Sequence, residues 1–118
     1  MVLDKSLARE LTLYIENDGG IYKSVTTPLI NNYARKKLRG VYNKQRAIKG
    51  ILMIVEAGRR KYIRDFGSIG GNMSMETKIQ IAKELYPMID EESTYEAKRL
   101  RKQAQAKSKL KKIVKRKH

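Results

Sequence analysis

The sequence contains no cysteine, and its one histidine is the last residue, His118. Without cysteine the chain cannot form disulfides, Cys-type zinc sites, iron–sulfur clusters or a thiol nucleophile. Because His118 is the one histidine of the sequence, a catalytic dyad built on imidazole is disfavoured. The longest uncharged apolar run, residues 50–55, is far shorter than the roughly 20 residues that span a membrane. Charges at Asp4, Arg9 and Glu10 interrupt any signal-peptide pattern, so we expect a soluble, intracellular protein without a membrane partner.

Charge is plentiful but unevenly distributed along the 118 residues, a length typical of one domain. Lys and Arg number 27 against 12 Asp and Glu, which gives a formal net charge of +15. Residues 97–118 hold eleven basic residues and no acidic one, whereas the first 96 residues have a balance of only +4. We therefore expect a compact helical body, residues 1–92, followed by a basic C-terminal tail, residues 93–118.

The body is predicted to be all-α, a small bundle of about four helices. A first helix through residues 7–15 is expected to end at the Asn-Asp-Gly-Gly sequence of residues 17–20; a β-hairpin turn at the same four residues is the alternative. Thr27 is expected to cap a second helix that starts at Pro28, because the residue before a proline avoids helical geometry. Gly40 is expected to end that helix.

The third helix is the clearest element, from a cap at Asn43 to about Phe66 before Gly67. Residues at helical spacing form one apolar stripe along it: Ile48, Ile51, Leu52, Val55, Tyr62 and Phe66. Arg59 falls on this stripe and is expected to reach water from the edge of the core. Glu56 and Arg60 are expected to form an i,i+4 ion pair.

A fourth helix is predicted to begin at a Ser74 cap, with Glu76 in its first turn. Its buried side comprises Ile79, Ala82, Leu85, Tyr86 and Ile89. Pro87 is expected to kink or end it. The Ser-Thr-Tyr-Glu sequence of residues 93–96 resembles a capping box that starts a separate last helix through the tail. Repulsion between like charges opposes this helix, so the tail is predicted to be either helical or disordered when free.

A loose pattern within residues 11–66 comprises Tyr14-Ile15-Glu16-Asn17-Asp18, Ile21-Tyr22, Asn32, Arg35-Lys36, Gly40, Tyr42, Ala47 and Lys61-Tyr62. In these residues the chain resembles a family of small uncharacterised phage proteins. The resemblance implies a phage or prophage context and a helical body. It implies no activity, and the basic tail lies outside the pattern.

The tail carries the strongest functional signal. Its basic residues are Lys98, Arg99, Arg101, Lys102, Lys107, Lys109, Lys111, Lys112, Lys115, Arg116 and Lys117. Such a dense line of cations predicts contacts with the phosphates of nucleic acid and release of counterions on binding. The alternatives are an anionic protein or membrane surface, or no partner; a membrane surface is disfavoured because the tail lacks Trp and Phe.

A second basic group lies in the predicted body. Arg35, Lys36, Arg39 and Arg60 are predicted to continue the positive track of the tail, and an ordinary solvated helix face is the alternative. A helix-turn-helix made by the second and third helices is less favoured, because the third helix is long for a recognition helix. Two tyrosines flank basic segments, Tyr42 and Tyr95, and are hypothesised to stack on unpaired bases.

The sequence as a whole favours a non-enzymatic nucleic-acid-binding accessory protein, phage-encoded, that binds the phosphate backbone of DNA or RNA through its tail. No cofactor or metal is expected, and Asp90-Glu91-Glu92 is interpreted as a solvated linker. The expected location is the cytoplasm of a bacterial host or the virion. The alternative function is a structural virion component, or an adaptor or inhibitor that docks on a host or phage protein.

Overall fold

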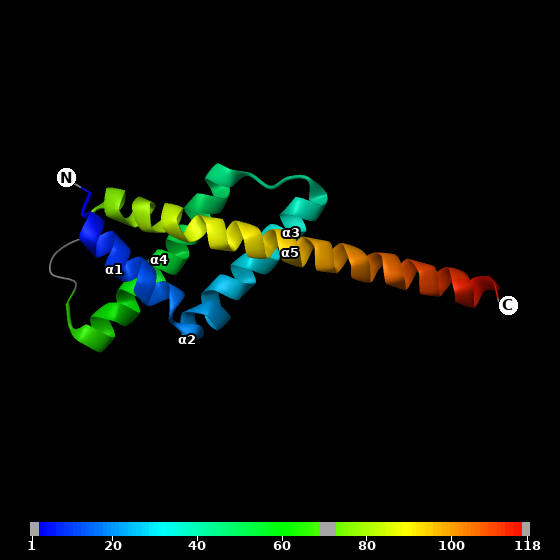
Figure 1. Ribbon diagram of the computed structural model, residues 1–118, viewed down its shortest axis with the longest axis horizontal. Helices are drawn as coiled ribbons and strands as arrows, with labels where there is room; N and C mark the ends of the chain where they lie inside the picture. Colours follow the sequence, from blue (N-terminus) through cyan, green and yellow to red (C-terminus); the bar gives the residue numbers. More distant parts are fainter. Residues whose placement is uncertain (1–2, 69–72, 117–118) are drawn as a thin grey trace.

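The computed structural model describes residues 3–68 and 73–116, except for the side chains of residues 113–116. Helices make up 89% of the described residues, and no strand occurs among them, so the all-α prediction is confirmed. The helical segments are α1 (Lys5–Glu16), α2 (Gly19–Ile21), the π-helical segment η1 (Tyr22–Thr26), α3 (Thr27–Arg39), α4 (Lys44–Phe66) and α5 (Met75–Arg116). Figure 1 shows α5 running the whole length of the molecule, with the other helices gathered around its first half.

The Asn-Asp pair at residues 17 and 18 separates α1 from the next helical segment. Asn17 is the C-cap of α1 and donates its backbone N–H to the carbonyl of Leu13, and the Asp18 N–H donates to the carbonyl of Ile15. The Asp18 carboxylate then accepts from the backbone N–H of Ile21 at 2.8 Å and starts α2. The two residues thus end one helix and start the next in succession, Asn17 through its backbone and Asp18 through its carboxylate. The predicted helix end is confirmed, and the hairpin alternative is wrong.

From Gly19 to Arg39 the chain is one continuous helical run, and the prediction that Thr27 caps a new helix at Pro28 is wrong. Thr27 has helical dihedrals, φ −61° and ψ −46°, and its N–H donates to the carbonyl of Tyr22, five residues back. A proline ring clashes with the carbonyl four residues before it in an ordinary α-helix. The wider π-helical turn of η1 relieves that conflict, so Pro28 is accommodated without a break.

Helix α4 has the predicted ends. The Asn43 side chain accepts from the Arg46 N–H at 3.1 Å, and Gly67 closes the helix with φ +86°, a conformation that disfavours side chains. The prediction that Phe66 belongs to the buried stripe is wrong, because its side chain is 65% exposed. It packs at the surface against the ring of Tyr62, with centroids 4.8 Å apart.

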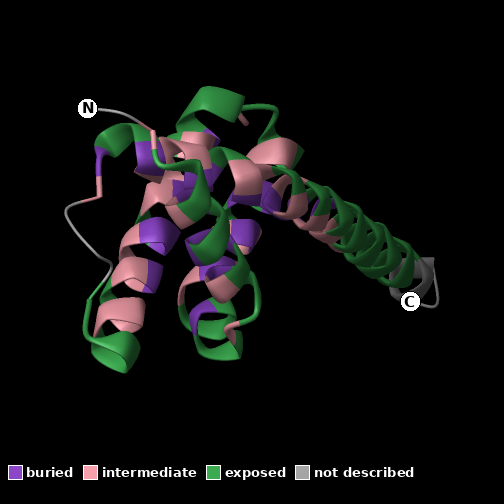
Figure 2. Ribbon diagram, turned by 60° about the vertical axis from the view of Figure 1, so that its left-hand side comes forward, coloured by how far each residue is buried: buried purple, intermediate pink, exposed green. Residues whose placement is uncertain are grey.

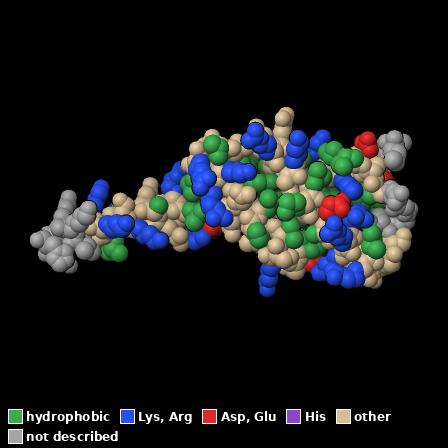
Figure 3. Space-filling model, turned by 180° about the vertical axis from the view of Figure 1, so that it is seen from behind, with side chains coloured by type: hydrophobic (Ala, Val, Ile, Leu, Met, Phe, Trp, Pro, Cys, Tyr) green, Lys and Arg blue, Asp and Glu red, His purple; other side chains and the backbone are tan. Residues whose placement is uncertain are grey.

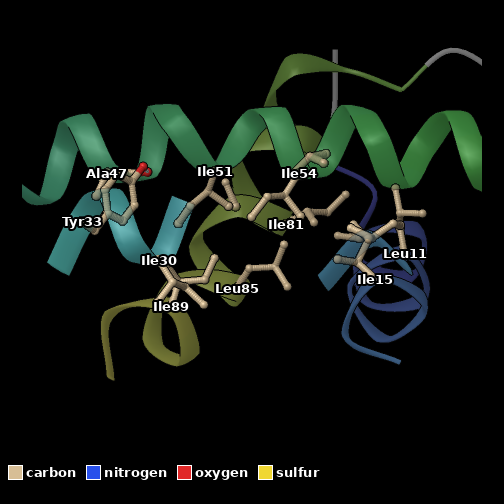
Figure 4. Packing of buried hydrophobic residues seen from close by; sticks show 14 residues of the cluster. Leu11, Ile15, Ile30, Tyr33, Ala47, Ile51, Ile54, Ile81, Leu85 and Ile89 are labelled. Carbon is tan, nitrogen blue, oxygen red and sulfur yellow. Dashed lines mark hydrogen bonds between the residues drawn. The ribbon is translucent and has the colours of Figure 1, made fainter. Parts of the chain in front are cut away.

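The core lies between the first half of α5 and helices α1, α3 and α4. Figure 4 shows side chains from all four helices meeting there. The residues that expose 5% or less of their surface to water include Leu11, Ile15, Ile30, Tyr33, Ile51, Ile54, Ile81, Leu85 and Ile89. Two glycines let α4 approach closely: a Cβ at Gly58 would lie 2.4 Å from Cγ1 of Ile15, and one at Gly50 would lie 2.2 Å from the Tyr33 hydroxyl.

Helix α5 is a single unbroken helix of 42 residues. Its predicted start is confirmed, since the Ser74 hydroxyl accepts from the Thr77 N–H at 3.2 Å. Pro87 does not end it, because the buried side chains of Leu85 and Ile89 hold both sides of the proline to the same core.

The predicted capping box at residues 93–96 is wrong. Ser93 is fully buried, and its hydroxyl donates to the carbonyl of Asp90 at 2.8 Å. The Thr94 hydroxyl donates to the same carbonyl at 3.0 Å. Both side chains therefore bond back into the preceding turn of a continuing helix, as Ser and Thr do in helix interiors. No separate last helix begins here.

The molecule is strongly elongated, with principal extents of 69 × 27 × 15 Å. Its radius of gyration is 18.7 Å, whereas a compact chain of this length has about 13.5 Å. Burial along α5 stops at Ala97, and beyond it every described side chain except the half-buried Leu100 is exposed. Residues 98–116, called the extension below, project about 28 Å at 1.5 Å per residue. Figure 2 shows burial confined to the body and the extension exposed along its length.

Candidate nucleic-acid interface

The extension presents its cations directly to water. The described basic side chains beyond Ala97 are all exposed: Lys98, Arg99, Arg101, Lys102, Lys107, Lys109, Lys111 and Lys112. Figure 3 shows Lys and Arg side chains along the extension. Of the other predicted residues, Lys115 and Arg116 lie in the helix but their side chains are not described, and Lys117 lies outside the described residues.

One of these cations is held by the only acidic residue close to it in sequence. Arg99 donates through Nε to Glu96 Oε2 at 2.9 Å and through Nη2 to Glu96 Oε1. This hydrogen bond lowers the pKa of the Glu96 carboxyl below its ordinary value. From Leu100 onward the sequence contains no carboxylate side chain. The described cations of the extension that have no carboxylate partner are therefore Lys98 and those from Arg101 onward.

The extension is anchored to the body by a lysine that was absent from the predicted site. Lys37 of α3 donates to the Asp90 carbonyl at 2.8 Å, the Asp90 carboxylate at 2.7 Å and the Thr94 hydroxyl at 2.7 Å. Burial opposes ionisation of Asp90, but Lys37 and the hydroxyls of Tyr42 and Tyr86 outweigh it and hold its pKa below the ordinary value. Lys37 is therefore a structural cation that fixes the direction of α5 just before the extension.

Tyr42 takes part in this anchor and is not a free stacking platform. Its ring lies 4.6 Å from Lys37 Nζ and 5.7 Å from the ring of Tyr33, and its hydroxyl bonds to Asp90 and Tyr86. Burial, with the neighbouring Tyr86 and Asp90, raises the pKa of Tyr42 above its ordinary value. The stacking hypothesis for Tyr42 is therefore disfavoured. Tyr95 is 73% exposed and keeps its face open.

A groove of about 980 Å³ lies where the extension leaves the body, between α5 and the start of α3. Four carboxylates line it, together with one lysine, two tyrosines and two apolar side chains: Asp90, Glu91, Glu92, Glu96, Lys98, Tyr22, Tyr95, Ile30 and Met88. The Tyr22 hydroxyl donates to Glu92 at 2.8 Å, which raises the pKa of Tyr22. In the described part of the chain no group of three acidic or histidine side chains is arranged to hold a metal ion.

The four predicted cations of the body do not form one compact patch. Arg35 and Arg39 are exposed near the end of α3, and Lys36 is half-buried with Nζ 5.9 Å from the ring of Tyr33. Arg60 instead lines a shallow hollow of about 500 Å³ beside Val25, which precedes α3. Val25 and Arg39 are fourteen residues apart in one helical run, about 21 Å along its axis. The predicted track is therefore split between two ends of the body.

Arg59 and Glu56 form an ion-pair cluster on α4. Arg59 Nη2 lies 3.1 Å from Glu56 Oε2, and Lys78 Nζ lies 2.8 Å from Glu56 Oε1. The hydrogen bond from Lys78, followed by that from Arg59, lowers the pKa of Glu56. The predicted Glu56–Arg60 pair is replaced by these two contacts. Arg59 reaches the edge of the core, as expected, and its charge is paired there with the Glu56 carboxylate.

Comparison of the chain with protein-family models, with curated proteins and with solved structures gives no match. Among the described helices, none combines the length and the apolar character that crossing a membrane demands. The geometry of this chain is therefore the basis for a functional proposal.

Proposed function

We propose that this protein is a non-enzymatic nucleic-acid-binding accessory protein whose extension binds the phosphate backbone. The observation that carries the proposal is the exposed run of cations on the second half of α5, with no carboxylate side chain after Glu96. Phosphates condense counterions, and a dense line of Lys and Arg displaces them on binding. We also propose a phage origin, in the host cytoplasm or the virion, on the basis of the sequence pattern in residues 11–66 alone.

The separation of charges supports this function. Among the described residues Glu91 and Glu92 form no ion pair, and these two carboxylates at the base of the extension repel phosphates, whereas the extension attracts them. Nucleic acid is then drawn to the projecting helix and away from the groove. The body holds that helix in a fixed direction through Lys37 and the core contacts of Ile89 and Ser93.

Truncation after Leu100 tests the proposal. It removes nine of the eleven basic residues and keeps Ala97 and the Glu96–Arg99 pair, so the body is expected to stay folded. If about five cations of the full chain contact phosphates, log affinity against log salt has a slope of about −4 to −5 on duplex DNA. The truncated protein is expected to give about −1 to −2. Full affinity and an unchanged slope after truncation would refute the proposal.

A second function, an adaptor that docks on another protein, is favoured by the acidic groove with the exposed Tyr95 at its rim. Purification with nuclease and high salt separates the two functions. Tight, salt-sensitive binding to labelled DNA or RNA supports the first function. A protein that co-purifies in equal amounts, together with weak nucleic-acid affinity, supports the adaptor.

A further inference from the structure

The extension is a continuation of a buried helix, and this limits how it can bind. Its first turn follows directly from Ser93 and Ala97, which are buried, and from Asp90 and Thr94, which Lys37 holds. A flexible polycation adapts to any arrangement of phosphates. A helix fixed at its base presents each cation at a defined angle around its axis and a defined height along it. The arrangement of charges around the axis therefore determines which cations can face a nucleic acid at the same time.

Cations gather on one face of the extension. At 100° per residue, five described basic side chains fall within an arc of about 100°: Lys98, Arg101, Lys102, Lys109 and Lys112. This set is called the cationic face below. Gln105 lies near the middle of the same arc. Lys107 and Lys111 lie on the opposite side, next to the apolar side chains of Ala104 and Leu110.

The composition of the extension favours a duplex over a single strand. Proteins that hold single strands stack the bases on aromatic side chains. Residues 97–118 contain no Tyr, Phe or Trp. Without aromatic side chains to stack on bases, the cationic face offers charged and polar side chains, and these suit the regular phosphate rows of a double helix.

The shape of the extension distinguishes between the two kinds of duplex. An α-helix with its side chains is about 10–12 Å across, and the major groove of B-form DNA is about 12 Å wide. The major groove of A-form RNA is deep and too narrow for side chains to enter. A straight helix of about 28 Å is therefore matched to DNA.

From these observations, and on the basis of the proposed function, we infer that the extension binds B-form DNA as a rigid helix in the major groove. The cationic face turns toward the DNA, and its edges reach the phosphates on the two walls of the groove. Lys107 and Lys111 face solvent. At the base, Glu91 and Glu92 keep the body outside the duplex, and Lys98, which lines the same groove, is the first residue of the cationic face.

Two interleaved pairs of lysines give a matched test of the face. Lys109→Gln with Lys112→Gln removes two cations from the cationic face, and Lys107→Gln with Lys111→Gln removes two from the opposite side. On a 20-base-pair DNA duplex we expect the first pair to lower affinity at least fivefold more than the second. The salt slope is expected to fall by about 2 for the first pair and by less than about 0.5 for the second. Equal losses would overturn the inference.

Two glutamines give a test of rigidity at constant charge. Gln103→Pro with Gln105→Pro interrupts the helix, and Gln103→Ala with Gln105→Ala preserves it; both glutamines are exposed, so neither change disturbs the core. We expect at least a tenfold loss of DNA affinity for the proline pair and little change for the alanine pair, with the loss of helix checked by circular dichroism. Retained affinity in the proline pair would show that the tail acts as a flexible chain.

A DNA duplex and an RNA duplex of the same sequence complete the test. We expect the unchanged protein to bind DNA at least tenfold more tightly than RNA at the same salt concentration. Equal affinity, or a preference for RNA, would overturn binding in the major groove. These failures leave the proposed function intact, because it requires only salt-sensitive binding. Absence of such binding to DNA and RNA alike would refute both.

Discussion

The two halves of α5 have the same backbone conformation but different sources of stability. Up to Ala97 the helix buries Ile81, Leu85 and Ile89 against three other helices. Beyond Ala97 no described side chain is buried and only Leu100 is half-buried, so helix propensity and attachment to the folded first half sustain the helix. One helix can thus lie at the centre of a core and also project from it, because its apolar residues are in the first half and its excess of positive charge is in the second half.

One aspartate in the core that packs against the first half of α5, and another in the extension, measure the difference most directly. Ile51 is completely buried beside α5, whereas Leu110 of the extension is 63% exposed. We expect Ile51→Asp to cost about 4–5 kcal/mol or more and to unfold the body, because it buries an unpaired charge. Leu110→Asp is expected to leave the melting temperature unchanged. Thermal unfolding followed by circular dichroism checks both; a fully stable Ile51→Asp protein would mean that the core is wrongly assigned.

The contact of Lys37 with α5, just before the two halves meet, is expected to give the next largest loss of stability when it is removed. Lys37→Met removes three hydrogen bonds and leaves the Asp90 carboxylate without its cation. The Asp90 side chain is 39% exposed, so water replaces part of the loss, and we expect a cost of about 1–3 kcal/mol. Arg35→Met, at an exposed position of the same helix, is the control and is expected to cost less than about 1 kcal/mol. Equal urea midpoints for the two variants would contradict this role of Lys37.

Local sequence signals predicted most of the helix ends. Asn43, Ser74 and Gly40 act through hydrogen bonds or backbone conformations within a few residues, so the sequence alone is enough to recognise them. The caps predicted at Thr27 and at Ser93–Glu96 are wrong because the same residue types act as caps or as interior residues, depending on the structure that precedes them. A π-helical turn before Pro28 and a buried helix before Ser93 made both sites interior.

The candidate site was predictable only where it does not depend on tertiary contacts. Runs of charge are visible in sequence, so the cations of the extension were found. The Lys37–Asp90 contact joins residues 53 apart, and nothing local distinguishes Lys37 from its neighbours Lys36 and Arg35. The separation of Arg60 from Arg39 likewise depends on how α4 crosses the helical run before it.

Acid is expected to weaken the body without changing the charge of the extension. The hydrogen bond from Lys61, with that from the Ile21 N–H, holds the pKa of Asp18 below its ordinary value. A carboxyl group whose folded pKa is lowered stabilises the fold above its unfolded pKa of about 3.9, and this contribution disappears as the pH falls below it. The melting temperature of Lys61→Met should therefore lie below that of the unchanged protein at pH 6, and the gap should narrow at pH 3.

Lys107→Met in the extension is the matched control for this titration. Lys107 is exposed on the extension, so replacing it removes one positive charge without touching the Asp18–Lys61 pair. We expect no difference in melting temperature from the unchanged protein at either pH. A gap for Lys61→Met that stays constant between pH 6 and pH 3 would show that the Asp18 pair does not control this part of the acid response.

The smallest expected effect concerns the cations of the body. Changing Arg35, Lys36, Arg39 and Arg60 together to Gln is expected to reduce the salt slope of DNA binding by about 1–2 and to leave stability nearly unchanged. Because Arg60 lies about 20 Å from the end of α3, a duplex held by the extension is not expected to use both sites. Lys49 lines the same hollow as Arg60, so Arg35→Gln with Arg39→Gln should be compared with Lys49→Gln with Arg60→Gln, two pairs of equal charge. A loss in one pair alone identifies the side of the body that faces the duplex, and no loss in either confines binding to the extension. Equal losses of affinity in both pairs would show that the body surrounds the nucleic acid. That result would contradict the inference that the body stays outside the DNA major groove.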